Sequence, residues 1–91
     1  MSTNFCAHLS ARNEVALNKE FEKKVGNNIR MLRENAKMTQ EQLAAKLQLA
    51  GCDITRSALA KIEVGQRHLY PDEIKLLKNL LHTNYDEIFK E

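Results

Sequence analysis

The sequence predicts an all-α fold, a compact bundle of about five helices. Long stretches of Leu, Ala, Lys, Glu, Gln and Met, all good helix formers, are interrupted by only three glycines and one proline. Apolar residues recur at spacings of three and four, and several of these runs begin at a residue that can cap a helix. Ninety-one residues, 43% of them hydrophobic, suit one modest core. We therefore expect a single folded domain.

The first long helix is expected over about residues 18–36. Apolar residues from Phe21 to Ala36 follow one another at spacings of four, four, three and four, which defines one helical face. Gly26 within this helix costs roughly 1 kcal/mol relative to Ala, so its presence indicates that another element approaches closely. Residues 1–17 have less regular patterning, and we interpret them as a flexible or locally helical arm. The domain itself is then residues 18–91.

Two shorter helices are expected between Thr39 and Arg67. Thr39 and Gln42 form a Thr-x-x-Gln capping box at the start of the first. Thr55 can cap the second, which runs to about Val64 before Gly65 ends it. In the first helix the residues expected to face inward are Leu43, Ala44 and Leu47.

The second helix of this pair places polar side chains near its N-terminus. Leu59 and Ile62 lie three apart on the inward face, so Arg56, Ser57 and Lys61 point outward. Arg and Lys can donate to O6 and N7 of guanine, and Ser can donate or accept. These side chains suit a recognition helix whose first turns enter the major groove of DNA. The alternative is an ordinary helical hairpin with solvated surface charges.

Residue identities favour the first interpretation, because the chain resembles the Cro and phage-repressor (XRE-type) helix-turn-helix family over about residues 25–89. The matching residues are Gly26, Ile29, Arg30, Leu32, Arg33, Thr39, Gln40, Leu43, Ala44, Leu47, Ser57, Leu59, Lys61, Ile62, Glu63, Gly65 and Arg67. The resemblance implies a lambda-repressor-like helix-turn-helix, in which Arg33 and Glu63 form an internal ion pair. It also implies phosphate contacts by Gln40 and Arg67.

The chain departs from the family between the two helices, where residues 48–54 are several residues longer than the usual turn. Either the first helix is a turn longer or the connection bulges. Thr55, which starts the second helix, is expected to be the third phosphate contact.

The C-terminal part predicts two more helices. Pro71 suits the first turn of one, whose buried face is formed by Ile74, Leu77, Leu80 and Leu81. Asn84 caps the last, a short helix in which Tyr85, Ile88 and Phe89 are unusually apolar. We interpret these three as candidates for a homodimer interface, since members of the resembled family commonly pair through this end. The alternative is that they only close the core.

The formal net charge is +2, distributed unevenly. Residues 26–70 carry seven basic and four acidic groups, a surplus of +3, whereas residues 71–91 carry three and five, a deficit of −2. A pI near 8.6 is modest for a protein that binds nucleic acid through charge alone. This charge distribution favours a protein that binds double-stranded DNA through a few specific contacts and as a dimer.

Other classes of function are not expected. Cys6, His8, Cys52, His68 and His82 include no CxxC or HxxxH pair, so we expect no metal site. No Ser/His/Asp set or Gly-rich phosphate loop can be placed, so we expect neither catalysis, nor a cofactor, nor a small-molecule substrate. No run is long enough to cross a bilayer, so we expect no membrane partner.

Together these observations predict a sequence-specific DNA-binding transcriptional regulator, a repressor that binds a palindromic operator as a homodimer. Its expected setting is the bacterial cytoplasm, associated with the nucleoid when bound to DNA. The alternative is a helical protein-interaction module, such as an antitoxin or an adaptor.

Overall fold

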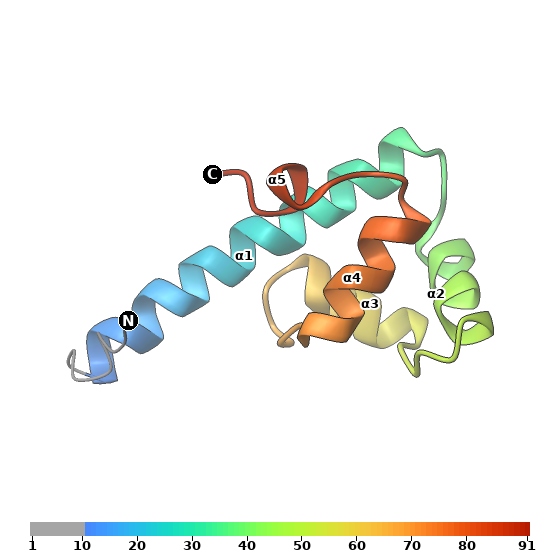
Figure 1. Ribbon diagram of the computed structural model, residues 1–91. Coiled ribbons are helices and arrows are strands. Elements are labelled where there is room, and N and C mark those ends of the chain that lie inside the picture. The colour runs from blue at the N-terminus through green and yellow to red at the C-terminus, as the bar shows by residue number, and fades with distance from the viewer. Residues whose placement is uncertain (1–10) are drawn as a thin grey trace.

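The computed structural model describes the backbone of residues 11–91 and the side chains of residues 19–91. This part of the chain is helical throughout its regular structure and contains no strand. The helices are α1 (Ala11–Asn35), α2 (Gln40–Leu49), α3 (Arg56–Glu63), α4 (Pro71–Leu80) and α5 (Tyr85–Ile88). The predicted all-α fold of about five helices is therefore confirmed (Figure 1).

Helix α1 is longer than the sequence pattern indicated. It begins at Ala11 rather than near Asn18, and its N-terminal turns extend beyond the other four helices (Figure 1). The helix thus includes part of the segment interpreted as an arm, and residues 1–10 lie outside the described residues. The division between arm and domain at residue 17 stays a prediction.

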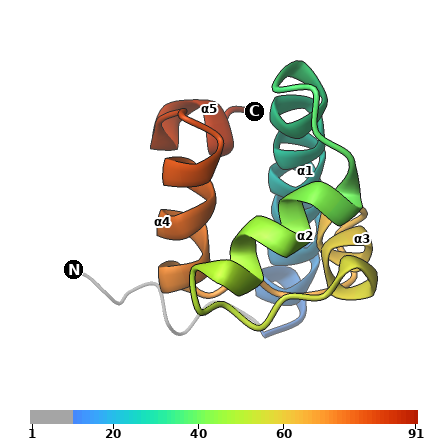
Figure 2. The ribbon, with the colours of Figure 1, turned by 90° about the vertical axis from the view of Figure 1, so that its right-hand side faces the viewer.

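The core lies where α1, α2 and α3 meet and continues beneath α4 and α5. Helix α2 lies across one end of the bundle, between α4 and α3 (Figure 2). The inward faces predicted for α2 and α3 are confirmed, since Leu43, Leu47 and Leu59 have no exposed surface. The remaining buried apolar residues are Val25, Ile29, Ala44, Ile54, Ile62, Leu77, Leu81 and Ile88. The face predicted for α1 is wrong at its two ends, where Phe21 and Ala36 are exposed.

Helices α1 and α3 are in close backbone contact at Gly26. A Cβ atom added to Gly26 would lie 2.1 Å from the carbonyl oxygen of Ile62. Only a residue without a side chain fits there. The close approach predicted from Gly26 is confirmed, and it fixes α3 against α1.

Four helices end in the same way. After each of α1, α2, α3 and α4 the chain makes paired 5→2 and 6→1 hydrogen bonds, the pattern of a Schellman motif. The residue in the left-handed conformation is Gly51 after α2 and Gly65 after α3, with φ of 90° and 80°. Lys37 and His82 take this place after α1 and α4, with φ of 61° and 54°. These two side chains cost roughly 1 kcal/mol each in a conformation that glycine adopts freely.

Candidate nucleic-acid interface

The outward face of α3 is polar at its N-terminal end. Arg56, Ser57 and Lys61 are exposed, whereas Leu59 and Ile62 are buried beneath them. Among the described side chains, neither Arg56 nor Lys61 has an ion-pair partner, so both guanidinium and ammonium groups can meet an external acceptor. The Thr55 hydroxyl accepts a hydrogen bond from the Ala58 amide at 3.1 Å, which fixes the start of the helix.

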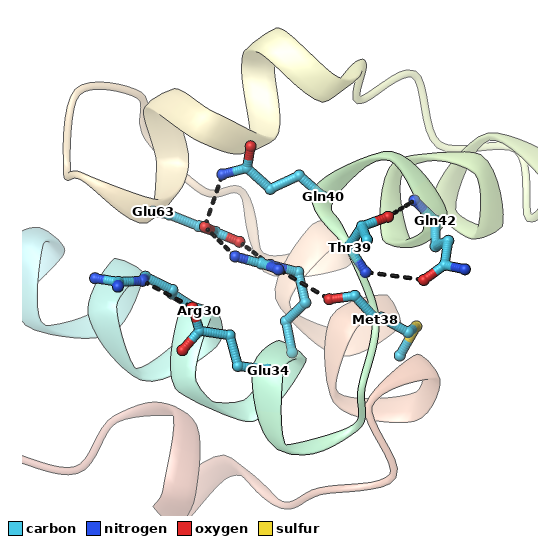
Figure 3. A network of polar contacts seen from close by, with 8 residues as sticks. Arg30, Glu34, Met38, Thr39, Gln40, Gln42 and Glu63 are labelled. Atoms are coloured by element: carbon cyan, nitrogen blue, oxygen red, sulfur yellow. Dashed lines mark hydrogen bonds and ion pairs between the residues drawn. The ribbon is translucent and has the colours of Figure 1, made fainter.

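Helix α2 begins near the C-terminal end of α3, with the capping box that the sequence predicted. The Gln42 amide donates to the Thr39 hydroxyl at 3.1 Å, and the Thr39 amide donates to the Gln42 side chain at 2.9 Å (Figure 3). The first amides of the helix then point away from it with no acceptor in the helix. This terminus can receive an oxyanion, although Glu41 in the same turn offsets part of its positive potential.

A buried ion pair joins α1 to the C-terminal end of α3. Arg33 donates through Nε to Glu63 Oε2 at 2.7 Å and through a terminal nitrogen to Oε1 at 3.1 Å. Its other terminal nitrogen donates to the carbonyl of Met38 at 2.9 Å (Figure 3). The two side chains are only 9% and 2% exposed. Hydrogen bonding to Glu63 raises the pKa of Arg33 despite its burial, so the guanidinium stays charged.

Gln40 completes this network, which sequence reasoning had not foreseen. Its side-chain nitrogen donates to Glu63 Oε1 at 2.9 Å, so the amide turns inward from the start of α2 (Figure 3). Glu63 thereby joins residues from α1, α2 and α3. One N–H of the Gln40 amide is used here, and the second has no acceptor among the described residues.

Arg67, another expected phosphate contact, already has an anionic partner. Its two terminal nitrogens donate to the carboxylate oxygens of Glu73 at 3.1 and 3.2 Å, and one also donates to the His68 carbonyl. Glu73 in turn accepts from the Tyr70 amide at 3.0 Å, at the start of α4. Burial disfavours the Glu73 charge, but the bonds from Arg67 and Tyr70 outweigh it and lower the pKa of Glu73. Arg67 therefore holds the loop after α3 against α4.

The long connection between α2 and α3 is a loop that follows directly on the end of α2. Helix α2 continues to Leu49, and the chain then forms a loop up to Thr55. The loop is anchored by the fully buried Ile54, whose carbonyl accepts from the Gln48 side chain at 3.1 Å. The extra residues thus bulge outward without moving α3 away from α2.

The three dimer candidates fall into two groups. Ile88 has no exposed surface and packs in the monomer core, so its assignment to a dimer interface is wrong. Tyr85 and Phe89 are 42% and 36% exposed. Phe89 stacks on Phe21 of α1, which the sequence pattern had placed in the core. Only the tertiary packing could show that Phe21 lies at the surface beside α5.

Cys52 is the one cysteine among the described side chains. The pKa of the Cys52 thiol is raised, first by burial and then by nearby Glu73 and Asp72, so the thiol stays neutral. Among the described residues no group of three or more His, Cys, Asp or Glu side chains gathers as metal ligands would. No helix in that part of the chain is long and apolar enough to span a membrane.

Comparison with known proteins points to the same kind of site. A helix-turn-helix family model of the Cro/C1 type matches residues 29–88, from the middle of α1 through α5. No curated protein and no solved structure matches the chain. The matched region contains α2, α3 and the whole network around Glu63, and it covers well over half of the sequence. The chain therefore belongs to the Cro/C1-type (XRE) helix-turn-helix family, a family of DNA-binding regulators.

Proposed function

We propose that this protein is a sequence-specific transcriptional regulator, a repressor that binds a palindromic operator in double-stranded DNA as a homodimer. In this proposal it acts in the bacterial cytoplasm, at the nucleoid. The observation that carries the proposal is the exposed, unpaired Arg56 and Lys61 on a helix whose opposite face is fixed in the core.

The rigid support of α3 suits base reading. Discrimination between bases requires donors held at defined positions, because a good bidentate pair contributes only about 1–3 kcal/mol. Gly26 and the Arg33–Glu63 pair hold the C-terminal half of α3 against α1. Arg56, Ser57 and Lys61 are then the base-reading residues of the proposal.

Phosphate contacts would fix the register of α3 in the groove. We assign them to the second N–H of the Gln40 amide, the Thr55 hydroxyl and Arg67. Arg67 would have to share its guanidinium between Glu73 and the phosphate, so its contribution is expected to be smaller than that of an unpaired arginine.

Selection of bound sites from random duplex DNA, followed by titration of single variants, tests this proposal. Arg56→Ala and Lys61→Ala should each weaken binding to the selected site by about 1–3 kcal/mol and relax the sequence preference. Lys46→Ala is a matched control, because it removes an exposed positive charge from α2 instead of α3. Retention of wild-type specificity after both α3 substitutions would contradict the groove assignment.

Salt dependence separates DNA binding from the alternative of a protein-interaction module. Release of counterions makes affinity for DNA fall steeply with added salt, by a slope of about −0.9 per phosphate contact on a double-logarithmic plot. An apolar protein interface responds weakly. Absence of any selected sequence, together with salt-insensitive binding to a protein, would favour the module.

A further inference from the structure

Two lysines continue the face of α1 that packs against α3. Gly26 marks the place where the two helices meet, since it packs on the backbone of Ile62. Lys23 precedes Gly26 by three residues and Lys19 precedes Lys23 by four, so all three lie on the same side of α1. Both lysines are exposed. Toward its N-terminus α1 extends beyond the other helices, so the face that α3 covers continues there as a row of exposed cations (Figure 1).

A hollow of about 350 Å³ joins the two lysines to the end of α3. Its lining is Lys19, Glu20, Lys23, Val64, Gly65 and Gln66. Gly65 packs directly on α1, because a Cβ atom there would lie 2.9 Å from Cα of Lys23 and 3.1 Å from its Cγ. The stem of Lys23 is thus held against the loop that follows α3. Among the described side chains neither lysine has an ion-pair partner.

The hollow also continues the outward face of α3. Ser57, Lys61 and Val64 follow one another at spacings of four and three, so they lie along one side of that helix. Ser57 and Lys61 are proposed to read bases, and Val64 lines the hollow. At eight residues α3 is about 12 Å long, comparable with the width of the major groove. Phosphates that border the groove therefore lie near the ends of the helix.

We propose that Lys19 and Lys23 form a phosphate-binding site on α1, which contacts the DNA backbone beside the groove that α3 reads. The hollow suits an oxyanion, because two ammonium groups and the Gln66 amide can all donate to it. The proposal rests on the proposed function and deepens it, since it extends the surface that binds DNA from the helix-turn-helix onto the first helix.

The acidic residues nearby offset the two lysines only in part. The Glu22 carboxylate contacts the imidazole of His68 and lines a different hollow, beside Leu69 and Ile74. Glu20 is exposed and lines the hollow of the two lysines, so its charge opposes an anion there. Two positive charges and one negative charge in this lining leave a surplus of +1. The site therefore attracts a phosphate, and Glu20 weakens that attraction.

The two lysines lie outside the part of the chain that matches the family model. That match begins at residue 29, after both of them. The contacts assigned to Gln40, Thr55 and Arg67 all lie within it. The site on α1 is therefore an addition to the surface that the family model describes.

The salt dependence of DNA binding tests the site. The full chain is titrated with the selected duplex and with a random duplex of the same length at several salt concentrations. Lys19→Gln and Lys23→Gln should each weaken binding to both duplexes severalfold. Each should also lower the slope of log affinity against log salt by about 0.9, the loss of one phosphate contact. Circular dichroism and thermal melts check that the variants keep the fold.

Lys24→Gln is the matched control. Lys24 is an exposed lysine of the same helix, next to Lys23, but it does not line the hollow. Its loss should leave the slope unchanged. Glu20→Gln should have the opposite effect and tighten binding severalfold, because it removes the opposing charge.

Three outcomes would overturn the site on α1. They are wild-type slopes in both Lys19→Gln and Lys23→Gln, an equal loss of slope in Lys24→Gln, and weaker binding by Glu20→Gln. If Arg56→Ala still relaxes the sequence preference in these cases, the DNA-binding proposal stands without the added site. Absence of salt-dependent DNA binding by the wild type would overturn both.

Discussion

Charged side chains are usually exposed and aromatic side chains usually buried, and the two ends of this small bundle each depart from one half of that pattern. Around α2 and α3 a charged pair, Arg33 and Glu63, is buried. Around α5, aromatic rings are exposed while Ile88 alone of the short helix is buried. A buried charge must be fully bonded to be tolerated, so it fixes the geometry of the elements that it joins. An exposed ring gains by being covered, so it favours association. One end is thus made rigid by a fully bonded buried charge, and the other leaves aromatic surface in water.

The largest expected effect breaks the buried network. Arg33→Ala leaves the Glu63 carboxylate buried with only Gln40 as a side-chain donor, and removal of one partner from a buried pair costs about 3–5 kcal/mol. Arg30→Ala is the control, since Arg30 pairs with Glu34 on the same helix with both side chains about half exposed. That exposed pair contributes about 0–1 kcal/mol. Urea titration of both variants measures the difference, and equal midpoints would show that the Glu63 network does not support the fold.

The next effect separates the buried and exposed residues of the aromatic end. Ile88→Ala removes a fully buried side chain and should cost about 2–5 kcal/mol in unfolding free energy. Phe89→Ala should cost less in the monomer, since part of the ring is already in water, but more in dimerisation. Thermal melts at low protein concentration together with sedimentation would reveal the contrast. The distinction between core and contact at this end would be lost if Phe89→Ala destabilised the monomer as much as Ile88→Ala.

The smallest effect concerns the ion pair between these two ends. Because the pKa of Glu73 is lowered in the fold, its charge stabilises the protein above the pKa of the unfolded chain. That contribution is lost as pH falls through the folded value. Glu73→Gln should therefore reduce stability by about 1 kcal/mol at pH 7, and the difference from wild type should shrink on acidification below about pH 4.5. Unfolding curves at several pH values give this difference. A gap that widens in acid would contradict the stated role of Arg67.

The local features of the helix-turn-helix were predictable because they depend on residues close in sequence. The Thr39 capping box, the stop at Gly65 and the inward face of Leu59 and Ile62 all follow from spacing and backbone conformation. The close approach at Gly26 was also indicated by the sequence. A glycine inside a helix lowers the stability of that helix, so its presence suggests that another element packs where a side chain would lie. The family resemblance led to the expectation of an Arg33–Glu63 pair.

Tertiary structure alone decided which side chains Gln40 and Arg67 would meet. Gln40 and Arg67 were expected to contact phosphate, yet Glu63 accepts a hydrogen bond from Gln40 and Glu73 accepts two from Arg67. A hydrogen bond depends on positions in space within about 3 Å, which no helical periodicity specifies.

The same limit applies to exposure at the aromatic end. Phe21 and Ile88 both lie on apolar faces in the sequence, but only one of them is covered when α5 folds onto α1. Helical spacing by itself determined that each residue belongs to an apolar face. Whether that face is covered within one chain or left exposed depends on where the next helix begins and ends. Helix α5 ends at Ile88, so Phe89 lies just beyond it.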